Sequence, residues 1–157
     1  MKNTFNPDGP GTLIVQEQQV KPESIVKTVA MIRNVALITV SGAGMVGAPS
    51  IAARVFNVLG ENNINVLMIS QSSSEANISL VIPRTSLEKA VNMLELSLLG
   101  NGLVKDVTSE TDICIVAVVG AGMRGTPGVA ARVFKAVADQ GVNIRMIAQG
   151  SSELNIS

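Results

Sequence analysis

The chain has 157 residues, of which 46% are hydrophobic and 15% are charged, so a sizeable core is available and a disordered chain is excluded. Twelve Lys and Arg balance twelve Asp and Glu, and this net charge of zero argues against nucleic-acid binding and favours self-association. The chain contains no His, which excludes His-based acid–base catalysis and His metal ligands, and no apolar run reaches the ~18 residues of a membrane span.

The first elements predicted along the chain are a strand, a loop and a helix. Residues 35–40 are continuously apolar and largely β-branched, as in a buried strand, and the glycine-rich stretch 42–47 is expected to be a loop. Pro49 suits the first helical position, because its missing N–H would be unpaired there anyway. Apolar side chains then recur at helical spacing over residues 51–59.

A hairpin, a second helix and a last strand are predicted to follow. In chain order we expect a strand at 64–70, a turn at 72–75, a returning strand at 77–82 that Pro83 stops, a helix at 87–98 and a strand at 103–107. The resulting order is β-α-β-β-α-β. It predicts an α+β, ferredoxin-like fold with an antiparallel sheet.

An internal repeat dominates the sequence. Residues 35–79 align without a gap onto residues 113–157 at a constant offset of 78, and 22 of the 45 pairs are identical. Both copies contain GAGM-x-G-x-P-x-x-AARVF followed by MI-x-Q-x-SSE-x-NIS. Two copies of one module therefore descend from a duplication, and the fold contains two such modules in tandem.

The second copy stops in its third strand, so its sheet needs a further strand from elsewhere. Residues 20–33 precede the first copy and are assigned to neither one. We expect residues 25–32 to supply a strand that completes the second module's sheet, which would make the first module an insertion in the second. The only cysteine, Cys114, is predicted to be a buried strand residue of the second copy.

The glycine-rich loops fit a dinucleotide-binding fingerprint, but their context does not. GAGMVG at 42–47 and GAGMRG at 120–125 both follow a predicted strand and precede a helix. However, no acidic residue ends the second strand, where Gln71 and Gln149 stand instead, and the predicted hairpin replaces the required helical crossover. A dinucleotide-binding module therefore stays a minor alternative.

The same loops are also suited to a free amino acid. The first turn of a helix offers unpaired N–H groups and a positive dipole end, which suit a carboxylate. The amides of Asn65, Gln71, Asn143 and Gln149 can hold an ammonium or a hydroxyl, although each could equally pair with backbone at a strand end. The repeated arginines, Arg54 and Arg132, are predicted to lie on solvated helix faces, with a ligand contact as the alternative.

These residues resemble the tandem ACT modules at the C-terminus of aspartate kinases. The resemblance rests on VALITVSGAGM, VGAGMRGTPGVAARVF and NIRMIAQGSSELNIS, and on NTFNPDGPGT at 3–12, which is similar to the junction after the kinase domain. It implies residues 1–19 as a linker from a kinase domain that this chain lacks, residues 35–110 as the first ACT module, and residues 20–34 with 111–157 as the second, truncated module.

The resemblance also implies where an effector binds, between the first module of one chain and the second module of another. The expected effector-binding residues are Met45, Ser50, Ala52 and Gln71 with Asn143 and Ile144 from the facing module. The reciprocal site would use Met123, Gly128, Ala130 and Gln149 with Asn65 and Val66. Some relatives place an acidic residue in the loop. Here the loops hold Met45 and Val46 or Met123 and Arg124, so no carboxylate is expected to await a second ammonium, which favours threonine over lysine.

The family function implied is feedback control of the phosphorylation of L-aspartate by ATP. The chain itself is expected to hold no catalytic residue, metal or cofactor, while ATP and Mg²⁺ would belong to the kinase domain of the parent protein. The partners implied are a free amino acid, a second copy in a homodimer and that kinase domain, in the cytoplasm, with no nucleic acid and no membrane. A dimerisation or scaffold module without a ligand stays the alternative.

Overall fold

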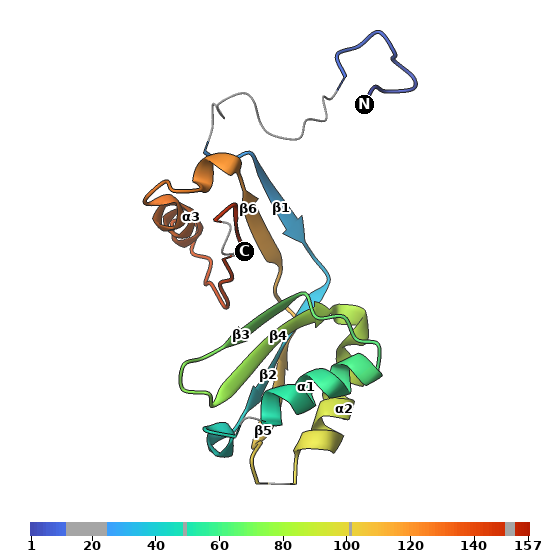
Figure 1. The fold of residues 1–157 in the computed structure, drawn as a ribbon, viewed down its shortest axis with the longest axis vertical. Coiled ribbons are helices and arrows are strands. Elements are labelled where there is room, and N and C mark those ends of the chain that lie inside the picture. The colour runs from blue at the N-terminus through green and yellow to red at the C-terminus, as the bar shows by residue number, and fades with distance from the viewer. Residues whose placement is uncertain (12–24, 49, 101, 150–152) are drawn as a thin grey trace.

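The computed structural model describes residues 1–11, 25–48, 50–100, 102–149 and 153–157 (Figure 1). We call the continuous block from residue 35 to 110 the first module. Its elements are β2 (Val35–Ser41), η1 (Ala43–Met45), α1 (Ser50–Glu61), β3 (Met68–Gln71), β4 (Asn77–Pro83), η2 (Arg84–Ser86), α2 (Leu87–Leu98) and β5 (Asp106–Glu110). The predicted order β-α-β-β-α-β is thus confirmed. Pro49, predicted at the first helical position, lies outside the described residues.

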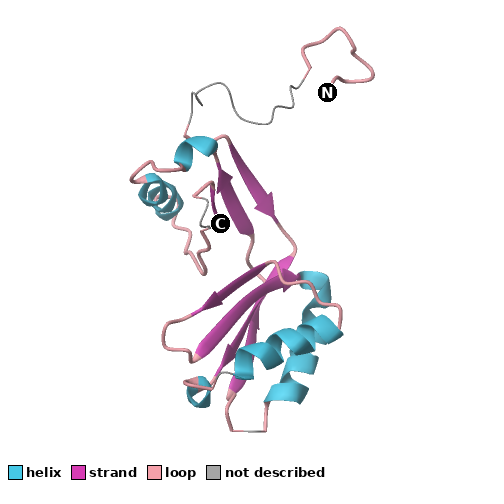
Figure 2. Ribbon diagram, viewed as in Figure 1, coloured by secondary structure: helices cyan, strands magenta, loops and turns pink. Residues whose placement is uncertain are grey.

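The first module is a four-stranded antiparallel sheet covered on one face by two helices (Figure 2). The strand order is β3-β4-β2-β5, so the central pair β2 and β4 is the most protected from solvent. Apolar residues of α1 and α2 meet the helix-facing residues of β2 and β4 in one core, in which Ile38, Val55, Leu80 and Leu94 are fully buried. This arrangement matches the ferredoxin-like prediction.

The remaining described elements form a second sheet with the order β1-β6-β7. We call β1 (Thr28–Ile32), β6 (Ile115–Val119), η3 (Ala121–Met123), α3 (Val129–Ala138) and β7 (Asn155–Ile156) the second module. β1 pairs antiparallel with β6, from Thr28 opposite Val119 to Ile32 opposite Ile115. A strand that precedes the first module therefore does join this sheet. The exact boundaries between the modules stay a prediction, and residues 12–24 lie outside the described part.

Residues 20–33 were assigned to neither copy, but their described part has a structural counterpart in the first module. The Lys27 amide donates to the Val119 carbonyl at 2.8 Å, as the Lys105 amide donates to the Ser41 carbonyl at 2.8 Å in the first module. These two bonds are related by the same offset of 78. β1 is therefore the counterpart of β5, and the weak match of IVKTV at 25–29 with LVKDV at 103–107 is the signal in the sequence.

Two strands of the first module differ from their predicted bounds. β3 begins at Met68 rather than at 64, because in the observed register Val66 would face Pro83, which has no N–H to donate. β5 spans 106–110 rather than 103–107, because its ladder with β2 begins where Asp106 faces Ser41. Four of its five residues are exposed, so apolar patterning could not mark this edge strand.

The counterpart of β3 is absent as a strand from the described second module. Only its last two positions pair, through the Ala148 and Ser157 backbones at 2.8 Å and a bridge between Gln149 and Ile156. The partners of residues 146 and 147 would fall at 158 and 159 by the same offset, which is after the last residue of the sequence. Residues 142–147 form no strand in the structure.

The second module is more open than the first. Ile38 is 0% exposed whereas its counterpart Val116 is 41% exposed. Cys114 is exposed, so the prediction of a buried cysteine is wrong. Its counterpart Ala36 is buried opposite Ile82 in the first module. Among the helices of the described ranges, none combines the length and the apolar character needed to cross a bilayer.

Candidate functional site

Each module carries the same loop between its central strand and its first helix. In the first module Gly42 directly follows β2, a single 3-10 turn comes next, and Gly47 adopts a positive φ of 69° before α1. A Cβ on Gly42 would clash with the Leu103 carbonyl and lie 2.9 Å from the Lys105 amide. The glycine fingerprint thus serves close approach between chain segments, and the antiparallel β3–β4 hairpin that follows is not the crossover a dinucleotide-binding unit requires.

A hollow of about 410 Å³ opens between this loop and the hairpin, and we call it the first pocket. It is lined by Met45, Gly47, Ala48, Ile51, Ala52, Gln71, Glu75 and Ile78. Met45, Ile51 and Ile78 are buried, so the floor is apolar. The polar groups, Gln71 and Glu75, stand at the exposed rim on the hairpin side.

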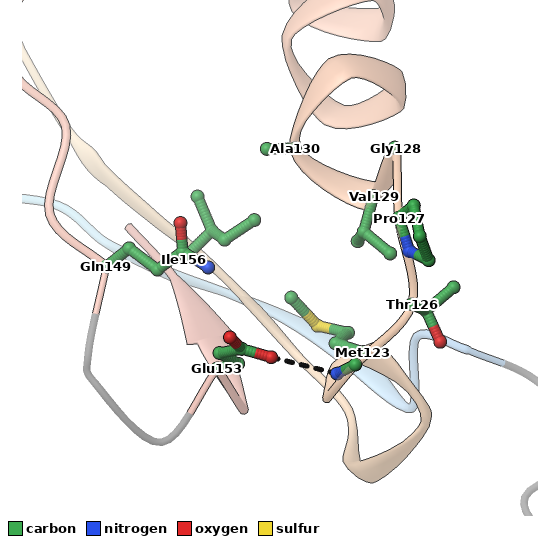
Figure 3. A pocket seen from close by; sticks show the side chains of 10 residues that line it. Met123, Thr126, Pro127, Gly128, Val129, Ala130, Gln149, Glu153 and Ile156 are labelled. Carbon is green, nitrogen blue, oxygen red and sulfur yellow. Dashed lines mark hydrogen bonds between the residues drawn. The ribbon is translucent and has the colours of Figure 1, made fainter.

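The second pocket is a hollow of about 380 Å³ at the same place in the second module (Figure 3). Its lining consists of Met123, Gly125, Thr126, Pro127, Gly128, Val129, Ala130, Gln149, Glu153 and Ile156. Every one of the eight residues that line the first pocket has its counterpart here, 78 positions later. The duplicated module therefore carries a duplicated pocket.

A glutamate at the rim of each pocket is the functional feature that the sequence analysis missed. The Gly47 amide donates to Oε2 of Glu75 at 2.9 Å, and the Gly125 amide donates to Oε2 of Glu153 at 2.8 Å, the bond dashed in Figure 3. From the loop residues we expected no carboxylate to await a second ammonium; the structure places one on the hairpin side of each pocket, where it already accepts from a glycine amide. The signal was available, since both glutamates recur in the SSE motif of the repeat.

The two pockets differ mainly along the loop that leads into the helix. Thr126 replaces Ala48, and its hydroxyl donates to the Gly122 carbonyl at 2.7 Å. Gly128 replaces Ser50 and precedes α3 with a φ of 81°, a left-handed conformation that glycine adopts without strain. The second pocket thus has a floor similar to that of the first pocket but a different entrance.

The structure brings together most of the predicted effector-binding residues of each module. Met45, Ala52 and Gln71 line the first pocket, and Met123, Gly128, Ala130 and Gln149 line the second. Ser50 lies exposed as the first residue of α1, next to the first pocket rather than among its lining residues.

The residues predicted to come from a facing module lie away from both pockets within one chain. Asn143 and Ile144 line a separate apolar hollow of about 410 Å³ between the two modules. Asn65 is exposed between α1 and β3, and Val66 packs partly buried against the core of the first module. A single chain therefore does not assemble either predicted site in full.

The arginines of the repeat separate into different roles. Arg54 is half-buried on α1 and donates to the Ser97 carbonyl in the last turn of α2 at 2.5 Å, so it joins the two helices rather than facing solvent. Arg132 is exposed, in agreement with a solvated helix face. Neither arginine lines a pocket.

Chemically, each pocket is suited to a small zwitterion. The first-turn amides of α1 and α3 have no partner within their helices and carry the positive end of the helix dipole, which suits a carboxylate. The glutamine amide opposite them can accept from an ammonium or a hydroxyl. The apolar floor leaves room for a short aliphatic group.

Comparison with known proteins identifies a family and relatives to which this chain is similar. The family model for the ACT domain matches residues 38–98 and 116–157. The whole chain is 42% identical to part of the bifunctional aspartokinase/homoserine dehydrogenase of Haemophilus influenzae, and 39% identical to part of the chloroplastic one of Daucus carota. It spans 20% and 18% of their lengths, about a fifth.

Solved structures show the same likeness. The regulatory subunit of aspartate kinase from Thermus thermophilus, in its ligand-free form, superimposes with a TM-score of 0.73 and 34% sequence identity. The match covers 85% of this chain and 86% of that subunit. The similarity thus extends over both modules and their arrangement.

Proposed function

The chain belongs to the ACT domain family and is a regulatory region of the aspartokinase type, and from this we propose that it binds an end-product amino acid and thereby controls the phosphorylation of L-aspartate by ATP through feedback. Threonine is the favoured effector and lysine the second choice. The observation that carries the proposal is the pair of equivalent pockets, each with a helix start, a glutamine and an apolar floor.

The residues of each pocket define how a threonine would lie in it. Its carboxylate faces the first-turn amides of α1 or α3, where the helix dipole stabilises negative charge. Its ammonium and hydroxyl face the amide oxygen of Gln71 or Gln149, and its methyl group rests on the apolar floor. The match of polar and apolar groups supports a small amino acid with a short side chain.

Threonine is favoured over lysine because of how the pocket carboxylates are used. Among the described lining residues, each pocket has one carboxylate, Glu75 or Glu153, which already accepts from a glycine amide at the rim. The apolar floor formed by residues such as Met45 and Ile51 offers no partner to a second ammonium. Lysine would have to leave that group in solvent or break the rim contact.

A second copy of the chain supports the site in this proposal. Asn143 and Ile144 would meet the first pocket of a partner, and Asn65 and Val66 would meet its second pocket, so a homodimer would complete both. Asn65, Asn143 and Ile144 are exposed and free to do so, whereas Val66 is partly buried in its own module. The net charge of zero opposes association of two copies only weakly.

Control of catalysis follows from binding at such an interface. An effector that bridges two chains binds one arrangement of the dimer better than another and shifts the population between them. Couplings of this kind are typically about 1–3 kcal/mol. The kinase domain of the parent protein, with its ATP and Mg²⁺, would respond through residues 3–20, and a cytoplasmic location stays a prediction.

Calorimetric titration of the chain with threonine, and separately with lysine, tests the proposal. We expect threonine to release or absorb heat and to occupy two sites per chain. Gln71→Ala should remove the first site and Gln149→Ala the second, whereas Gln140→Ala, an exposed glutamine outside both pockets, should change neither. A folded, dimeric chain that binds neither amino acid would contradict the proposal and favour a scaffold.

A further inference from the structure

The rim glutamates connect the two walls of each pocket. One wall comes from the loop and the helix start, including Met45 and Gly47, and the other comes from the β3–β4 hairpin, including Gln71 and Glu75. The loop is held to the hairpin at its start by the Gly42 amide, which donates to the Ala76 carbonyl at 3.0 Å. At the end of the loop, the described contacts include one hydrogen bond to the hairpin, in which the Gly47 amide donates to the Glu75 side chain.

The second module repeats this pair of contacts in detail. The Gly120 amide donates to the Leu154 carbonyl at 3.0 Å, and the Gly125 amide donates to Glu153 at 2.8 Å. Flanking residues have changed since the duplication, for example Val46 to Arg124, but the contact itself is the same. The same exposed hydrogen bond, between the same atoms, is thus present in two copies that have diverged. We relate it to a feature that both copies have, which is the pocket.

The backbone of these glutamates is also unusual. Glu75 has a φ of 57° and Glu153 a φ of 56°, a left-handed conformation that non-glycine residues rarely adopt. A glycine would fit this turn position with less strain, yet a carboxylate stands there in both modules. This conformation is strained for a residue other than glycine, so the carboxylate must provide an advantage at this place.

We propose that Glu75 and Glu153 are positioning residues that hold each pocket in its binding shape by fixing the end of the loop to the hairpin turn. This inference rests on the proposed function, because it concerns how the effector pocket is kept ready. The carboxylate acts through the glycine amide, and the loop then places the helix start opposite the glutamine. Fixing the two walls in advance lowers the ordering cost of binding.

Two substitutions at each site separate this role from others. Glu75→Gly removes the carboxylate while glycine keeps the left-handed turn, so the module folds, and threonine affinity of the first pocket should fall about three- to tenfold. Glu75→Gln keeps an oxygen that can accept from the Gly47 amide, so its affinity should stay within about twofold of the wild type. The same substitutions of Glu153 should have the same effects on the second pocket. The control is Glu61→Gly, which replaces an exposed glutamate at the end of α1.

The experiment combines titration calorimetry with threonine and amide NMR of the full chain. In the glycine variants the Gly47 or Gly125 amide signal should move upfield and exchange faster, whether or not threonine is present, and in the glutamine variants it should move little. Equal affinity in the wild type and the glycine variants would overturn the inference. So would equal losses in the glutamine and glycine variants, which would mean that the negative charge itself contacts the effector.

The two proposals fail in different ways in this experiment. If the wild type binds neither threonine nor lysine, the proposed function fails, and the positioning role fails with it even where the amide signals show the rim bond. If the wild type binds threonine and only the ranking of the variants is wrong, the proposed function stands and the positioning role alone is refuted.

Discussion

At the scale of single residues, Gly42 and Gly120 show why the repeat keeps its glycines. Each lies where a neighbouring strand starts, and a Cβ there would come within 2.9 Å of the amide nitrogen of Lys105 or Lys27. The backbone of Gly42 is extended, so the constraint is space and not conformation. The loop can therefore contact the strand beside it only when the side chain is absent.

Substitution of Gly42 tests this explanation, with a control substitution that should change the free energy of unfolding in the opposite direction. Gly42→Ala must push aside backbone atoms of residues 103–105, so we expect a loss of about 2 kcal/mol or more in the free energy of unfolding. Gly60 lies in α1, and no atom lies within 4 Å of the place that an alanine methyl group would take, so Gly60→Ala should stabilise by about 0.5–1 kcal/mol. Urea denaturation measures both, and a harmless Gly42→Ala would contradict the steric account.

At the scale of elements, the first module has polar contacts that join its two helices. Arg54 of α1 donates to the Ser97 carbonyl, one of the last-turn carbonyls of α2 that have no partner within the helix. The Lys89 ammonium of α2 also donates to the Asn62 carbonyl just after α1, at 2.8 Å. The two helices are thus joined by polar contacts at the edges of their apolar interface.

The arginine pair of the repeat provides a matched test of this contact. Arg54→Ala should cost about 1–2 kcal/mol in the free energy of unfolding, because it leaves a half-buried carbonyl without its charged donor. Arg132→Ala, at the equivalent but exposed position of α3, should stay within about 0.5 kcal/mol of the wild type. Equal effects of the two substitutions would show that the helix contact contributes nothing.

How far the sequence could predict each element depended on where the element lies in its sheet. The helices and the central strands β2 and β4 show clear apolar periodicity, and the structure places them close to the predicted bounds. The edge strand β5 is mostly exposed, so its polar residues show no such periodicity. Glu75 recurs in the repeat, but its contact with a glycine 28 residues away follows no spacing rule, so its role at the pocket needed the structure.

At the scale of the whole molecule, an apolar seam joins the two modules. The sheet face of the first module that lacks helices contributes Val35, Leu37 and Val81, which pack with Ile115 of β6. Next to this seam, Arg145 of the second module pairs with Glu110 of β5 at 2.9 Å, with about half of each side chain exposed. The seam removes apolar surface from water, whereas the ion pair stays open to screening by salt.

We therefore expect the seam to dominate the stability of the junction. Ile115→Ala should lower the free energy of unfolding by about 2–4 kcal/mol, since the side chain is 8% exposed. Arg145→Gln should cost less than about 1 kcal/mol, and less still at high salt. A larger loss for Arg145→Gln than for Ile115→Ala in thermal or chemical unfolding would contradict this order.

The duplication gives the molecule its central property, which is one pocket built twice. All eight lining positions of the first pocket also line the second, and six of them hold the same residue in both, whereas Ala48 and Ile51 are replaced by Thr126 and Val129. If the modules bind the same amino acid, one effector concentration sets the state of both, and their interface can respond as a unit. The pockets differ at Ala48 and Thr126, so unequal affinities are compatible with this account.

The most direct test maps where threonine binds by amide NMR of the chain. The account predicts that threonine shifts the signals of Gly47 and of the first turn of α1, and also those of Gly125 and of the first turn of α3, with little change on β5. Saturable shifts at both helix starts would support effector binding in the twin pockets. Shifts confined to the hollow between the modules, or no saturable shifts from a folded dimer, would contradict it.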